Sequence, residues 1–135
     1  MWRKSLDLGV TVASGTDAPV EPVNPLANFY AAVTRKQLSG LPPDGYESGQ
    51  KMARQEALYA MTMAGAIAGF EEANKGSVSV GKYADLTILS QDILVVAETD
   101  LLNTRVESVW VGGEMVFLRE PRGHSVNQGA PSAAY

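Results

Sequence analysis

The side chain best placed to do chemistry is the carboxylate of Asp17, in the stretch VTVASGTDAPVEPVNPL at residues 10–26. Asp17 follows an apolar, β-branched run and stands directly before Ala18-Pro19, so a proline stiffens the loop that holds it. A carboxylate at the end of a buried strand can act as a general base or bind a metal ion. Aspartate is also a common turn residue, and these residues taken alone favour the turn.

Other metal-binding side chains are scarce. The sequence has no cysteine, and its single histidine, His124, lies in REPRGHSVNQGAPSAAY. The Gly, Pro, Ser and Ala of that segment predict a flexible tail over residues 119–135. A zinc site needs several converging ligands. We therefore expect this chain alone to lack a complete metal site, and we do not assign His124 as a ligand.

The composition excludes several classes of function. The 135 residues carry a net charge of −4 without any cluster of basic residues, which argues against a nucleic-acid partner. No apolar stretch approaches the ~20 residues that span a bilayer, so no membrane partner is expected. The first ten residues, MWRKSLDLGV, lack the features of a signal peptide. The expected location is cytoplasmic.

The elements that would position Asp17 are predicted from periodicity and end signals. Residues 2–8 read as a helix that stops at Gly9. Residues 10–14 read as a short strand with apolar groups on both faces, as in a covered parallel sheet. A helix over 24–37 has Asn24 as its N-cap and Pro25 in its first turn.

The second half of the chain changes from helix to strand. Residues 37–52 predict a long loop of the kind that can act as a lid. Residues 53–73 predict a helix that Thr62 interrupts. Alternating residues predict strands near 78–80 and 86–89, followed by a hairpin over 106–117 with a Gly112-Gly113 turn. One parallel strand cannot close a sheet, so we expect the chain to be part of something larger.

Three segments in order resemble the C-terminal portion of the amidohydrolase superfamily. They are GVTVASGTDAPVEPVNPLANFYAAVTR, ARQEALYAMTMAGAIAGFEEANKGSVSVGKYADLTILS and TRVESVWVGGEMVF, which together cover about residues 5 to 118. The GSVSVGKYADLTIL signature is typical of amidohydrolases in general. The SGTDAPVEPVNP version with the following AAVTR points to the third amidohydrolase family, the YtcJ-like predicted metal-dependent hydrolases.

The resemblance implies an α/β fold, namely the C-terminal fragment of a (β/α)8 barrel plus strands of a small composite β-sandwich. Residues 1–74 would hold the last barrel strand and its helices, 75–118 the sandwich portion, and 119–135 the tail. Asp17 would then lie just past the C-terminal end of a barrel strand, where such barrels place their chemistry.

The resemblance also implies a role for Asp17. In the family this aspartate contacts the metal, expected to be zinc, and the attacking water, so Asp17 is predicted as both catalytic residue and metal ligand. The family's His-x-His pair and mid-barrel histidines have no counterpart here. Glu21 is more simply a solvated loop charge, Phe29 and Tyr30 core residues, and Asp85 a residue that bonds local backbone.

Two functions follow as expectations. In the first, the chain is the C-terminal part of a metal-dependent amidohydrolase that hydrolyses C–N bonds of a small-molecule substrate, and is inactive alone. In the second, it is a non-catalytic α/β module for assembly or binding. Because apolar residues of a barrel fragment would lack cover, we expect a homo-oligomer if the chain is stable alone.

Overall fold

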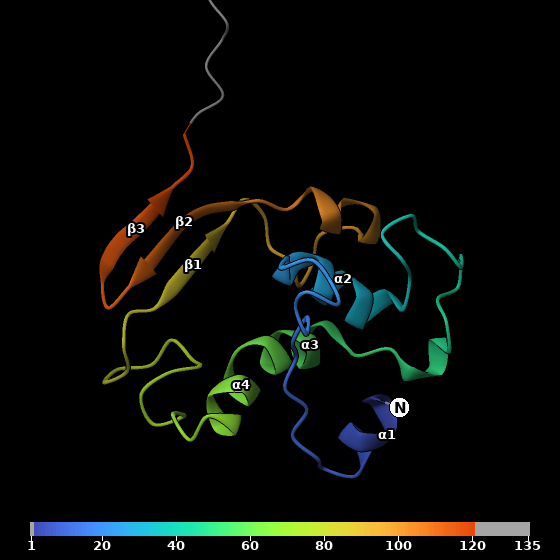
Figure 1. Cartoon of the computed structure of the whole chain (residues 1–135), viewed down its shortest axis with the longest axis horizontal. Coiled ribbons are helices and arrows are strands. Elements are labelled where there is room, and N and C mark those ends of the chain that lie inside the picture. The colour runs from blue at the N-terminus through green and yellow to red at the C-terminus, as the bar shows by residue number, and fades with distance from the viewer. Residues whose placement is uncertain (1, 121–135) are drawn as a thin grey trace, which may run out of the picture.

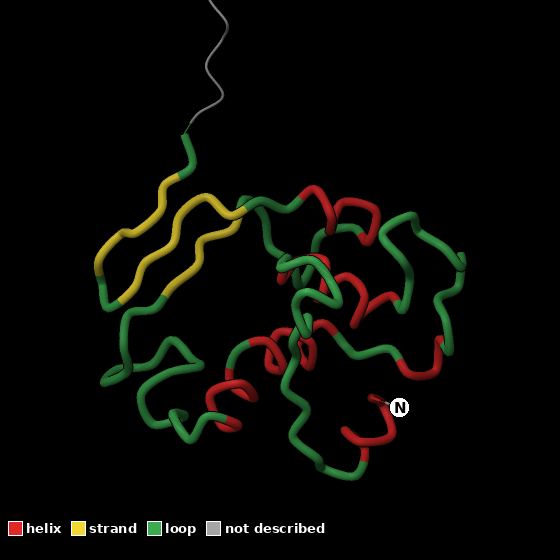
Figure 2. Tube along the Cα trace, in the orientation of Figure 1, coloured by secondary structure: helices red, strands yellow, loops and turns green. Residues whose placement is uncertain are grey.

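A computed structural model describes residues 2–120 and shows a helical part joined to a small sheet. Figures 1 and 2 show the helices gathered on one side and the sheet on the other. No helix in residues 2–120 is long and apolar enough to cross a membrane. His124 and most of the predicted tail fall outside the described residues.

The chain begins with α1 (Trp2–Asp7) and then runs without regular structure toward α2. Gly9 adopts a φ of 76°, which confirms the predicted glycine stop. The predicted strand at 10–14 is wrong, because no described strand pairs with this segment. A β-rich sequence forms a strand only where another strand accepts its backbone hydrogen bonds.

Helix α2 (Pro25–Thr34) has the predicted start. The Asn24 Oδ1 accepts hydrogen bonds from the backbone N–H groups of Leu26 and Ala27 at 3.1 and 3.3 Å. The helix ends at Thr34, three residues before the predicted end, because Arg35 takes a left-handed φ of 60°. The Arg35 N–H still donates a hydrogen bond to the Ala31 carbonyl and closes the last turn.

The predicted long helix is two short ones, α3 (Arg54–Met61) and α4 (Met63–Ala68). Thr62 separates them, as predicted, with φ −122° and ψ −86°. Its hydroxyl donates to the Leu58 carbonyl at 2.8 Å, so it bonds back to the preceding turn and does not cap α4.

The loop at 37–52, which contains the one-turn helix η1 (Ser48–Gln50), is fastened to the end of α2. The Tyr46 N–H donates to the Arg35 carbonyl at 2.8 Å and the Met52 N–H to the Ala32 carbonyl at 3.0 Å. Arg35 also stacks over the Trp2 ring at 4.4 Å. This segment is therefore a packed surface loop.

The sheet is antiparallel, in the order β1 (Leu86–Leu89), β2 (Val106–Val111), β3 (Glu114–Leu118). Gly112 and Gly113, with φ of 58° and 85°, form the predicted hairpin turn between β2 and β3. The predicted strand at 78–80 is wrong. Val78 and Val80 lie in an unpaired, exposed connection, which alternation alone does not distinguish from a strand.

The core lies where α2, α3 and the 3-10 helix η2 (Glu98–Asn103) meet. Phe29 is its largest fully buried apolar side chain, at 1% exposed. Alanines of α3 allow α2 to pack closely against it. The buried core residues are Phe29, Tyr30, Ala32, Met52, Ala57, Ala60, Ile93 and Leu101.

Candidate active-site loop

Asp17 lies at the start of a turn between the irregular segment 10–16 and α2. Its φ is 50°, and its backbone carbonyl accepts a hydrogen bond from the Val20 N–H at 2.8 Å. The side chain is exposed and, within residues 2–120, has no hydrogen-bond or ion-pair partner. The main chain of Asp17 therefore makes the turn, and its carboxylate remains open to react or to bind.

The loop that carries Asp17 is held at both of its ends. On one side, the Ser14 N–H donates to the Ala60 carbonyl of α3 at 2.9 Å. On the other, Asn24 caps α2. The nine residues between these positions, 15–23, make a surface loop whose base rests on the packed α2–α3 pair.

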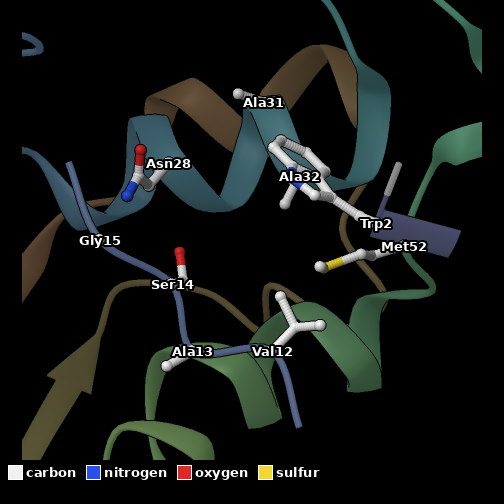
Figure 3. A pocket seen from close by; sticks show the side chains of 9 residues that line it. All are labelled: Trp2, Val12, Ala13, Ser14, Gly15, Asn28, Ala31, Ala32 and Met52. Atoms are coloured by element: carbon white, nitrogen blue, oxygen red, sulfur yellow. The ribbon is translucent and has the colours of Figure 1, made fainter. Parts of the chain in front are cut away.

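A cavity of about 140 Å³ lies behind the segment that precedes Asp17. Figure 3 shows Ser14 and Asn28 bordering this space, with Trp2 and Met52 at its other end. The cavity is mainly apolar, and its lining residues do not include Asp17. The complete lining is Trp2, Val12, Ala13, Ser14, Gly15, Asn28, Ala31, Ala32 and Met52.

The other residues considered from the sequence have the roles expected of them, with the exception of Asp85. Phe29 and Tyr30 are buried, and Glu21 is exposed in the loop. Asp85 bonds backbone that is distant in sequence, accepting from the Gly112 N–H at 2.8 Å. Trp2 is partly buried beneath Arg35.

Sequence reasoning missed the ion pair between Arg3 of α1 and Glu56 of α3. Two nitrogens of the guanidinium donate to the two carboxylate oxygens at 2.6 and 2.8 Å. Glu56 also accepts from the Ala53 N–H at 2.7 Å, which satisfies a free donor at the start of α3. A Glu three residues after a helix N-cap is the signal that could have revealed this second contact.

The ion pair makes the stability of the chain depend on pH. The hydrogen bonds from Arg3 and then from Ala53 lower the pKa of Glu56 below its ordinary 4.5, against the opposing effect of burial. The stability that Glu56 contributes is therefore present above pH 4.5 and lost as pH falls through its folded pKa. In Glu56→Gln, we expect urea unfolding between pH 6 and 3 to show a smaller loss of unfolding free energy on acidification.

Glu21→Gln is the matched control for this titration, because it removes an exposed loop carboxylate and leaves Arg3 untouched. If the two variants show the same pH dependence of unfolding free energy, Glu56 has no special part in it.

The described residues do not by themselves form a metal centre. Across residues 2–120, no three His, Cys, Asp or Glu side chains are grouped closely enough to hold an ion. Protein metal sites of the catalytic type use about three such ligands. A metal ion held by Asp17 would therefore need its other ligands from beyond this part of the chain.

The fold of this chain is similar to that of a known amidohydrolase structure. An amidohydrolase from Thermotoga maritima MSB8, known from its crystal structure, aligns with 86% of this chain at a TM-score of 0.60 and 26% sequence identity. The alignment covers 25% of that protein. The class defined by the fold is therefore the amidohydrolase superfamily.

The sequence comparisons specify the family. The Amidohydrolase family model matches residues 1–117. YtcJ of Bacillus subtilis, named as an amidohydrolase, is 28% identical to this chain over 116 residues. These residues are 86% of this chain and 22% of YtcJ. An N-substituted formamide deformylase of Arthrobacter pascens is 30% identical over 117 residues, which are 87% of this chain and 21% of the enzyme. The chain belongs to the Amidohydrolase family and is a YtcJ-like member of the superfamily.

The size of the match matters for function. The chain spans about a fifth of the length of the curated relatives that it matches. The match therefore establishes that the chain belongs to the family over this part of the relatives' length.

Proposed function

We propose that this chain is the C-terminal part of a metal-dependent amidohydrolase that hydrolyses C–N bonds of a small molecule. In this proposal residues 10–14 correspond to the last strand of a (β/α)8 barrel, and Asp17 contributes the carboxylate at its end. The metal is expected to be zinc. The isolated chain is expected to be inactive, because it supplies only one residue of the active site, Asp17.

The observation that carries the proposal is the free carboxylate of Asp17. A turn aspartate normally uses its side chain to accept a backbone N–H, but here the carbonyl of Asp17 makes the turn bond and the side chain is unpartnered within the described residues. A positioned carboxylate can take a proton from an attacking water and pass it to a leaving amine. The nitrogen-containing substrate is supported by the kinship with an N-substituted formamide deformylase.

The uncovered surfaces around the helices support the idea of a larger assembly. Within the described residues, segment 10–16 makes two backbone hydrogen bonds to helices, from the Val10 N–H to the Ser5 carbonyl of α1 and from the Ser14 N–H to the Ala60 carbonyl of α3. Most of its backbone groups are therefore available to neighbouring strands. An open groove of about 890 Å³ separates α3 and α4 from β1. Leu58, Met61 and Ile88 are among the apolar side chains that line it. A longer polypeptide would bury this surface.

The test is to express two products, the 135-residue chain and the longest reading frame that contains it. Both are assayed for amine release from N-substituted formamides, with zinc and with a chelator. We expect chelator-sensitive hydrolysis from the longer product and none from the short chain. Hydrolysis by the short chain, or a longer product that lacks any such activity, contradicts the proposal.

The rival function is a non-catalytic module that assembles through its exposed apolar residues. The observation in its favour is β3, in which all five residues are exposed and four, Met115 to Leu118, are apolar. If no reading frame extends upstream and light scattering finds the 135-residue chain in a defined oligomer, the module explains the chain better than the hydrolase does.

A further inference from the structure

The two ends of the segment that leads to the Asp17 loop are attached to successive turns of one helix. Arg3 binds the Glu56 side chain, and Ser14 binds the Ala60 carbonyl. Glu56 and Ala60 are four residues apart in α3, so they lie on the same face of the helix. Residues 3–14 are therefore attached to that face of α3 at both of their ends.

Within residues 3–14, further backbone hydrogen bonds connect α1 to the residues that follow it. The Val10 N–H donates to the Ser5 carbonyl at 3.0 Å and the Gly9 N–H to the Leu6 carbonyl at 2.9 Å. These bonds fold the chain back on α1 and direct it toward α3. In Figure 1 the segment that follows α1 passes across α3 on its way to α2.

We propose that Arg3 and Glu56 are positioning residues, which hold α1 on α3 and thereby fix the Ser14 anchor from which the Asp17 loop extends. The functional meaning rests on the proposed role of Asp17, whereas the mechanical coupling does not. Glu56 is suited to this task because the Ala53 N–H and the bidentate guanidinium restrain its carboxylate from two sides. Asp7, at 2.8 Å from the Arg3 Nε, restrains the guanidinium further.

The coupling is tested by amide hydrogen exchange, read residue by residue by NMR, on the 135-residue chain. In Arg3→Gln, we expect exchange of the Ser14 amide to accelerate roughly tenfold, because local opening no longer has to break the Arg3–Glu56 contact between α1 and α3. The Met52 amide, which bonds Ala32 inside the core, reports global opening. It is expected to change much less.

Lys36→Gln is the matched control, because it removes another ion pair between distant segments, Lys36–Glu98 at 2.6 Å, away from the Asp17 loop. We expect it to leave Ser14 exchange unchanged. Arg3→Lys, which keeps the charge but not the two-pronged contact, should give an intermediate acceleration. The proposal is overturned if Ser14 and Met52 accelerate equally in Arg3→Gln, or if Lys36→Gln affects Ser14 as strongly.

The consequence for chemistry is measured separately in the longer reading frame. There Arg3→Gln should lower kcat by roughly tenfold with little change in KM, since the loop is misplaced while the substrate pocket persists. If kcat is unchanged while Ser14 exchange accelerates, Arg3 has no role in catalysis. The mechanical coupling between the Arg3–Glu56 pair and Ser14 would still hold. If the longer product has no hydrolase activity at all, the proposed function fails, and the exchange result stands independently.

Discussion

Asp17→Asn in the longer reading frame is expected to reduce hydrolysis by about 10²- to 10⁴-fold, the usual contribution of a general acid–base group. The substitution is informative because asparagine keeps the size of the side chain and also tolerates the left-handed conformation found at residue 17, where φ is 50°. The turn that depends on the Asp17 carbonyl should therefore persist. Steady-state kinetics, with thermal unfolding in parallel, checks both expectations.

Two further variants separate the chemistry of Asp17 from the turn. Glu21→Gln neutralises another exposed carboxylate of the same loop, and activity is expected to stay within about threefold of the parent because a solvated charge contributes little. Asp17→Ala removes both the carboxylate and the tolerance for positive φ, so it should lose activity and some stability. If Asp17→Asn keeps full activity while Asp17→Ala loses it together with stability, Asp17 is a turn residue only.

Gly45→Ala is expected to be the most destabilising substitution in the loop at 37–52, lowering the free energy of unfolding by about 3 kcal/mol or more. A Cβ at position 45 would lie 2.1 Å from the Thr34 carbonyl oxygen and 3.1 Å from the Arg35 Cβ. Thr34 is fully buried, and its hydroxyl donates to the Tyr30 carbonyl at 2.8 Å. The end of α2 therefore cannot withdraw without loss of its own contacts.

The matched control for this prediction is Gly81→Ala. Both glycines have positive φ, 82° at Gly45 and 93° at Gly81, but none of the described residues would lie within 4 Å of a Cβ at position 81, chain neighbours aside. Gly81→Ala should therefore cost only the backbone strain, about 1 kcal/mol. Urea unfolding of the two variants measures the difference. Equal losses would mean that the close approach of the loop to α2 does not exist in solution.

Features that depend on local chemistry were predictable from the sequence. Asn24 and Pro25 begin α2, Thr62 separates α3 from α4, and Gly112-Gly113 turns the β2–β3 hairpin. In each case the preference belongs to a few neighbouring residues, namely a capping side chain, a hydroxyl that bonds the preceding turn, or freedom to take positive φ. The resemblance to amidohydrolases, carried by ordered segments of the sequence, is confirmed by the family match over residues 1–117.

Features that depend on distant partners were decided only by the tertiary structure. Residues 10–14 and 78–80 have the sequence of strands, but within residues 2–120 no strand lies beside them, so they stay irregular. The Arg3–Glu56 pair and the Ser14–Ala60 bond join residues more than forty positions apart, which no local pattern reveals. The sequence by itself thus determined the kinship, the caps and the turns. Tertiary structure decided that the Asp17 carboxylate has no polar partner among residues 2–120 and which contacts hold its loop, because both depend on which groups meet in space.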